Sequence, residues 1–74
     1  MPKVPRITGA EAIRAFGKVG YVLERVSGSH HILKRSQSAT LSIPCHGNKT
    51  IGVGLLRAQI DAAGLTVEQF IELL

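Results

Sequence analysis

The sequence predicts an α+β fold in which a layer of helices covers one face of a three-stranded antiparallel sheet. The order of patterns predicts it, because one helical pattern precedes three short strand patterns and two further helical patterns follow them. Size points the same way, since 74 residues with 45% hydrophobic side chains can bury one such layer and no more. We therefore expect one domain over residues 1–74.

The first helix is expected to follow an extended lead-in over residues 1–7. Thr8 and Glu11 match a capping box, in which each side chain accepts a hydrogen bond from the other residue's backbone N–H. Gly20 is expected to end this helix. Apolar residues at helical spacing predict its buried stripe: Ala12, Ile13, Phe16 and Val19.

Turn chemistry divides the next segment into strands. Residues 27–29 read Ser-Gly-Ser and residues 36–39 read Ser-Gln-Ser-Ala, compositions that favour turns. Such short turns imply an antiparallel meander, and Pro44 stops its last strand or marks a sheet edge. The three strands are expected over residues 21–26, 30–35 and 40–43.

Two more helices are expected after a glycine-rich loop over residues 45–54. Gly64 closes the first of them, and a cap over residues 66–69 begins the second. The resulting order of elements is similar to that of the double-stranded-RNA-binding domain. The apolar stripes are Val53, Leu56, Ile60 and Ala63 in one helix, and Val67, Phe70, Ile71 and Leu74 in the other.

Basic residues are concentrated in one part of the chain. Residues 1–57 hold all nine Lys and Arg residues and only two acidic ones, a net charge of +7, whereas residues 58–74 hold three acidic residues and carry −3. A basic body suits a polyanion partner, most simply nucleic acid, although a basic surface without a partner has the same composition. A single cysteine, Cys45, and the absence of a secretory leader or a long apolar run predict a cytosolic protein with no membrane association.

The stretch Gly28-Ser29-His30-His31 is best suited to chemistry. Histidine exchanges a proton near neutral pH, glycine allows a tight turn, and the Ser29 hydroxyl can brace that turn or bind a phosphate. Successive strand residues point to opposite faces, so at most one of the two histidines faces a given ligand. Neither alternating set, His30-Ile32-Lys34 or His31-Leu33-Arg35, is cleanly apolar. Alternation alone therefore leaves open which histidine is catalytic.

Other kinds of site fit less well. Imidazole and thiol ligands are present, but residues 25–60 lack acidic ligands and no C-x-x-C or H-E-x-x-H spacing occurs, so no metal is expected. Cys45-His46 as a nucleophile and its base lacks a third, orienting group. Lys49 can hold a phosphate or be a solvated lysine on a loop tip, and Arg57 can reach an anion near the start of the second helix. Tyr21 is the single stacking platform for bases, and packing is its simpler role.

Several motifs agree with one family. Gly28-Ser29-His30 matches a G-S-H core, and residues 43–46 match a strand-ending V-P-x-H. Residues 54–57 resemble the start of a following G-T-L-R-x-I-L helix, and residues 63–70 resemble an A-G-L-x-x-E-E-F tail. In these motifs, over nearly its whole length, the chain resembles the HicA-type (YcfA-like) toxins. Leu33 and Leu55 depart from the pattern, replacing a frequent aromatic residue and a threonine cap.

The resemblance implies a toxin that cleaves mRNA without a ribosome and is silenced by a HicB-type antitoxin. His30 fills the G-S-H position and is the expected catalytic residue, with His31 in reserve. RNA carries its own nucleophile, the 2′-hydroxyl, so a histidine general base and groups that hold the phosphate are sufficient, with no cofactor. The groups expected to hold RNA are Ser29, Lys34, His46, Lys49 and Arg57.

Two other classes of protein are compatible with the same residues. A non-catalytic RNA-binding module of this fold would bind RNA in a salt-dependent manner, and its binding would survive the change His30→Ala. A protein-interaction domain that docks through its acidic C-terminal end would have no affinity for RNA.

Overall fold

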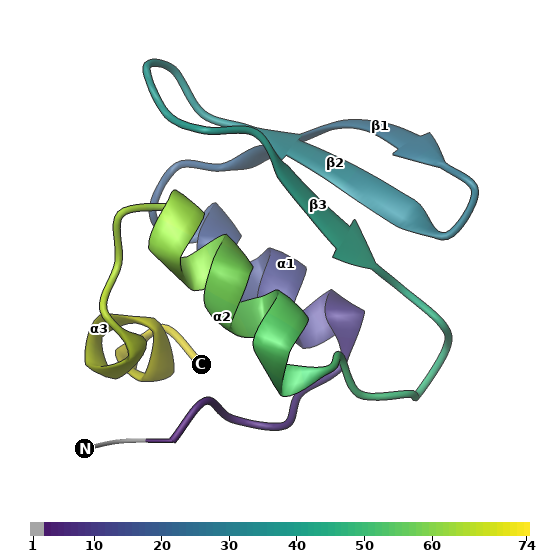
Figure 1. Ribbon diagram of the computed structural model, residues 1–74. Helices are drawn as coiled ribbons and strands as arrows, with labels where there is room; N and C mark the ends of the chain where they lie inside the picture. The colour runs from purple at the N-terminus through teal and green to yellow at the C-terminus, as the bar shows by residue number, and fades with distance from the viewer. Residues whose placement is uncertain (1–2) are drawn as a thin grey trace.

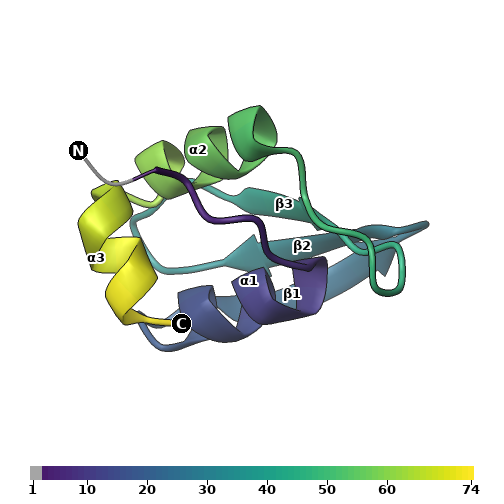
Figure 2. The same cartoon turned by 90° about the horizontal axis from the view of Figure 1, so that it is seen from below.

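A three-stranded antiparallel sheet and three helices make up the computed structural model, which describes residues 3–74. The sheet order is β1-β2-β3, and α1 and α2 lie against the same face of it (Figure 1 and Figure 2). The expected α+β order of elements is confirmed. In chain order the elements are α1 (Gly9–Gly17), β1 (Val22–Ser27), β2 (His30–Lys34), β3 (Leu41–Pro44), α2 (Val53–Ala62) and α3 (Val67–Glu72).

The first helix begins at its predicted cap. The Thr8 hydroxyl accepts from the Glu11 N–H at 3.3 Å, and the Glu11 carboxylate accepts from the Thr8 N–H at 3.0 Å. Hydrogen bonds from the Thr8 backbone and side chain hold the pKa of the Glu11 carboxyl below its ordinary value. The regular helix ends at Gly17, earlier than expected, and Gly20 closes the following turn with a φ of 100° that favours glycine.

The sheet follows the predicted meander, and each strand lies within one residue of its expected bounds. β1 and β2 form a hairpin in which Ser27 pairs with His30. β2 is the central strand, and Pro44 is the last residue of the edge strand β3. The β1–β2 register shifts between Leu23 and Arg25, which marks a β-bulge in β1.

The hydrophobic core lies between the sheet and the helices. The Phe16 ring packs against Phe70 with ring centroids 4.9 Å apart and against Tyr21 at 5.9 Å, so α1, α3 and the start of the sheet share one aromatic cluster. Every element except β1 contributes a fully buried large side chain. The other fully buried large residues are Leu33, Leu41, Ile43, Leu56 and Ile60.

Three positions of the predicted helical stripes are exposed rather than buried. Val53 is 39% exposed, Ile71 38% and Leu74 50%. Val53 begins α2 and Leu74 ends the chain, and a stripe that is read from periodicity alone extends past the neighbour it packs on. Among residues 3–74 no helix has the length and apolar character needed to cross a bilayer.

Arg35, one residue after β2, joins the C-terminal ends of two helices to the sheet. Its guanidinium donates to the Val19 C=O at 3.0 Å and to the Ala63 C=O at 2.9 Å, and it lies 4.5 Å from the centroid of the Tyr21 ring. The Tyr21 hydroxyl in turn donates to the Ala39 C=O at 2.9 Å, and only 4% of the residue is exposed. Tyr21 is therefore a packing residue, and its ring is not open to a base.

The loop that follows β3 is attached to the start of α1. The Ile51 N–H donates to the Ile7 C=O at 2.8 Å, and Thr8 and Thr50 form an antiparallel bridge beside it. Residues 3–7 contain no helix or strand, and the first part of the expected lead-in, residues 1–2, lies outside the described residues.

Candidate active site on the open face of the sheet

The two histidines of β2 point to opposite faces of the sheet. His31 pairs with Ile43, and Leu33 pairs with Leu41, whose side chains are fully buried, so this side of β2 faces the helices. The other side of the sheet is covered by no helix of residues 3–74 (Figure 1), and His30 lies on that side and is exposed. His31 is half-buried on the core side.

We call the uncovered side the open face, and define it by His30, Ile32 and Lys34 of β2 together with Ser42 of β3. Ser42 pairs with Ile32 and is therefore the diagonal neighbour of His30. His30 Nδ1 lies 3.2 Å from Ser42 Oγ, a hydrogen-bonding distance. Nε2 is on the opposite edge of the ring and has no hydrogen-bond partner within residues 3–74.

Ser29 and His46 lie together at the His30 end of the sheet. The Cys45 N–H donates to the Ser29 C=O at 2.8 Å, which holds the chain after β3 against the β1–β2 turn. Ser29 Oγ is then 3.4 Å from His46 Nε2. Gly28 has a φ of 61°, which this tight turn requires. Two of the predicted site residues, Ser29 and His46, therefore meet here, although 17 positions separate them in the chain.

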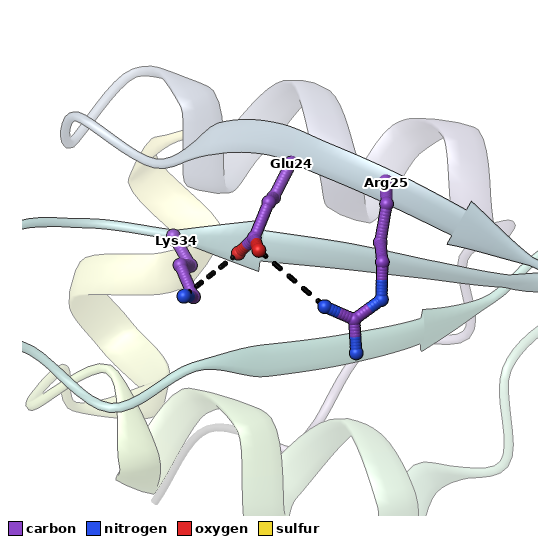
Figure 3. A network of polar contacts seen from close by, with 3 residues as sticks. All are labelled: Glu24, Arg25 and Lys34. Atoms are coloured by element: carbon purple, nitrogen blue, oxygen red, sulfur yellow. Dashed lines mark hydrogen bonds and ion pairs between the residues drawn. The ribbon is translucent and has the colours of Figure 1, made fainter.

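Lys34, predicted to hold phosphate, makes an ion pair that the sequence did not predict. Its Nζ lies 3.0 Å from Glu24 Oε2, and Glu24 Oε1 lies 3.4 Å from an Arg25 guanidinium nitrogen. Figure 3 shows the three side chains in front of the strands with the helices behind, on the open face. The side chains of Lys34 and Arg25 are 57% and 64% exposed, so solvent weakens both pairs and a phosphate can displace Glu24.

The β-bulge explains why Glu24 and Arg25 meet on one face. In a regular strand two adjacent residues point to opposite faces. The register shift between Leu23 and Arg25 adds one residue to β1, which lets both charged side chains reach the open face. Sequence reasoning missed this cluster because no local pattern marks the position of the bulge.

Lys49 and Arg57 occupy different parts of the structure. Lys49 is exposed in the turn after His46, where its N–H donates to the His46 C=O at 3.1 Å. Arg57 belongs to α2, in the helical layer, and its Nε lies 3.3 Å from Asp61 Oδ1. The structure does not join Arg57 to the open face. Arg57 lines an open groove of about 570 Å³ between residues 3–6 and the start of α2.

Cys45 and His31, the remaining side chains that could bind a metal or act as a nucleophile, are partly buried. Cys45 packs against Gly9 at the start of α1, and burial raises the pKa of its thiol, which disfavours the thiolate that a nucleophile needs. His31 Nδ1 is buried and has no hydrogen-bond partner within residues 3–74. Over the same residues, no three His, Cys, Asp or Glu side chains are close enough together to bind a metal ion.

The fold and the site define a class of protein: a small basic α+β domain whose open sheet face carries an exposed histidine and two cations. A family model described as the HicA toxin of bacterial toxin-antitoxin systems matches residues 9–65 of the 74-residue chain. The chain belongs to the HicA toxin family. No relative was found among curated proteins. Membership of this family confirms the resemblance seen in the sequence motifs, and it supports a role for this protein as the toxin of a toxin–antitoxin system.

Proposed function

We propose that this toxin is a metal-independent endoribonuclease that cleaves mRNA without a ribosome, with His30 as the general base. The observation that carries the proposal is the position of His30: exposed, on the open face, with the Nε2 edge of its ring unpartnered among the described residues. Membership of a toxin family supports it, because destroying mRNA is a direct way to stop growth.

The chemistry requires few groups from the protein, because the nucleophile belongs to the RNA. Nε2 of His30 takes the proton of a 2′-hydroxyl, and the 2′-oxygen attacks the adjacent phosphorus. The bond from phosphorus to the 5′-oxygen then breaks, and that oxygen takes a proton from solvent. The products are a 2′,3′-cyclic phosphate and a free 5′-hydroxyl. General base catalysis of this kind contributes roughly 10²- to 10⁴-fold.

His30 is better placed for this role than His31. A phosphodiester is bulky and hydrated, so its base must be reachable from solvent. His31 is half-buried on the core side, and its Nδ1 is fully buried. To reach RNA it would have to leave its contacts with the core. We therefore assign the base to His30 and retain His31 only as the comparison residue in the experiment below.

The groups around His30 suit a phosphate backbone. Ser29 and His46 lie at the same end of the sheet and can donate hydrogen bonds to the scissile phosphate, with Lys49 on the adjoining turn. Lys34 is four residues from His30 along β2, about 13 Å at the usual strand rise, which suits a phosphate further along the RNA. Arg57 is a contact for RNA outside this face, at the groove beside α2.

A HicB-type antitoxin is the proposed partner, and mRNA as the substrate implies action in the cytoplasm. The antitoxin silences the toxin by covering the open face, because a partner seated there excludes RNA from His30. This mode of inhibition predicts that His30 becomes inaccessible to solvent in the complex. A complex that leaves His30 exposed and still binds RNA would contradict it.

The test compares wild-type protein with the variants His30→Ala and His31→Ala. Cleavage of a labelled single-stranded RNA is followed in EDTA, and binding is measured in parallel by fluorescence anisotropy. We expect His30→Ala to slow cleavage by about 100-fold or more with binding retained. His31→Ala should keep most of the activity of its folded fraction, which circular dichroism measures.

Two results would contradict the proposal. Equal cleavage by wild type and His30→Ala would remove His30 from the chemical step. Salt-dependent binding without cleavage by the wild type would identify a non-catalytic RNA-binding module of the same fold.

A further inference from the structure

Ser42 touches the proposed base but was not among the residues that the sequence singled out. It lies on β3, one strand away from His30, and its hydroxyl oxygen is 3.2 Å from His30 Nδ1. Within residues 3–74, the His30 ring makes no other hydrogen bond. The contact with Ser42 is therefore the polar interaction that can fix the orientation of the exposed imidazole on the open face.

The Ser42 backbone is held in place from two directions. The Ser42 N–H donates to the Gln59 side-chain carbonyl of α2 at 3.2 Å. Its neighbours Leu41 and Ile43 are fully buried against the helices. The Ser42 backbone is thus fixed by a hydrogen bond on its outer edge and by the packing of its two neighbours on the core side. Without a partner such as Ser42, the exposed His30 ring would sample several rotamers.

We propose that Ser42 is a positioning residue for His30, a role that rests on the proposed function. A serine hydroxyl can donate or accept, and the 3.2 Å distance allows either role. In the proposal it accepts from Nδ1–H, which keeps the neutral imidazole in the tautomer whose lone pair is on Nε2. Only that tautomer can take the 2′-hydroxyl proton at Nε2, because in the other one Nε2 already carries a proton. The bond also holds the ring in one rotamer, so the base is oriented before RNA arrives.

The proposal separates Ser42 from a serine that merely stabilises the β2–β3 pairing. A structural serine would affect the amount of folded protein and leave the state of the ring unchanged. A positioning serine changes the ring: in water, free histidine favours the tautomer with the proton on Nε2, and loss of Ser42 returns His30 toward that form.

The direct test is nuclear magnetic resonance of the imidazole nitrogens of His30 in the folded protein without RNA. We expect the wild type to show the proton on Nδ1 in the neutral ring, and Ser42→Ala to shift the population toward Nε2–H. Ser42→Thr, which keeps a hydroxyl on a residue that strands favour, should restore the wild-type spectrum. Ser36→Ala, in an exposed turn, is the matched control and should change nothing.

Kinetics give the second readout. Ser42→Ala should lower kcat about three- to tenfold, the factor that one ordinary hydrogen bond contributes to a population, with KM unchanged. Ser42→Thr should recover it. A wild-type ring with its proton on Nε2 would show that Ser42 donates to Nδ1 and would overturn the proposal. Equal tautomer populations in wild type and Ser42→Ala, or an unchanged kcat, would overturn it as well. Because the tautomer is measured without RNA, a wild type that cleaves nothing would refute the proposed function without hiding the result for Ser42.

Discussion

Glu24 limits how much positive charge the open face offers to RNA, and the change Glu24→Gln tests this. The carboxylate pairs with Lys34 at 3.0 Å and with Arg25 at 3.4 Å (Figure 3). A phosphate that binds Lys34 must first displace the carboxylate. Glutamine has nearly the same shape and no charge, so it removes this competition with little change in packing.

The size of the effect follows from the exposure of the pair. Ion pairs between exposed side chains contribute about 0.2–1 kcal/mol each. Releasing the Lys34 pair before RNA binds should therefore tighten the dissociation constant for single-stranded RNA about 1.5- to 5-fold at low salt. If one more phosphate is then contacted, the slope of log K against log salt becomes steeper by about 0.7. Because both ion pairs of Glu24 are lost, the free energy of unfolding should fall by no more than about 2 kcal/mol.

The assay is fluorescence anisotropy of a labelled RNA at several salt concentrations, in a His30→Ala background that prevents cleavage. Glu68→Gln is the matched control, because it makes the same change in net charge on α3, away from the open face. The reasoning is refuted if both variants change the affinity equally, since the effect would then come from total charge. It is also refuted if Glu24→Gln weakens binding.

Three further outcomes follow from contacts away from the open face. Arg35→Lys keeps the charge but loses the two hydrogen bonds to the Val19 and Ala63 carbonyls, and should lower the free energy of unfolding in urea by about 1.5–3 kcal/mol. The control Arg14→Lys, at an exposed position, should change it by less than about 0.5 kcal/mol. Gly9→Ala places a methyl group against the Pro44 C=O and the Cys45 thiol, and should lower the free energy of unfolding by about 1–3 kcal/mol in the same assay. A variant as stable as the wild type would show that the surrounding atoms move apart at no cost. Burial raises the pKa of the Cys45 thiol, so iodoacetamide should react more slowly with the folded than with the urea-unfolded protein near pH 8, and equal rates would contradict a shielded thiol.

The order of elements could be predicted because it depends on local signals. The Thr8–Glu11 and Thr66–Gln69 capping boxes both form as the sequence indicated, and the Ser-Gly-Ser turn sets the β1–β2 hairpin. Limits of local reasoning appear at Arg35. A charged residue next to the core made the inner side of β2 look unsuited to burial, yet its partners are carbonyls 16 and 28 positions away. No pattern in a short window reports such distant acceptors.

The candidate site was predictable in part for the same reason. Alternation correctly separates His30 from His31 and places them on opposite faces, but only the buried partners of β3 decide which side is the core. Glu24 joins the site through a bulge, and Ser42 joins it through pairing with a strand whose register the sequence does not specify. Arg57 lies in the second helix, as expected, but that helix belongs to the layer on the other side of the sheet from the open face.

The measurement that tests the central claim most directly is cleavage of a short RNA that carries one 2′-deoxy nucleotide at its mapped cleavage position. With the 2′-hydroxyl as nucleophile and His30 as its base, the account predicts that the normal RNA yields a 2′,3′-cyclic phosphate and a 5′-hydroxyl in EDTA. The substituted RNA should stay intact at that position while binding equally well. Cleavage of the substituted RNA at the same bond, or products that end in a 5′-phosphate, would show that water is the nucleophile and would contradict the mechanism.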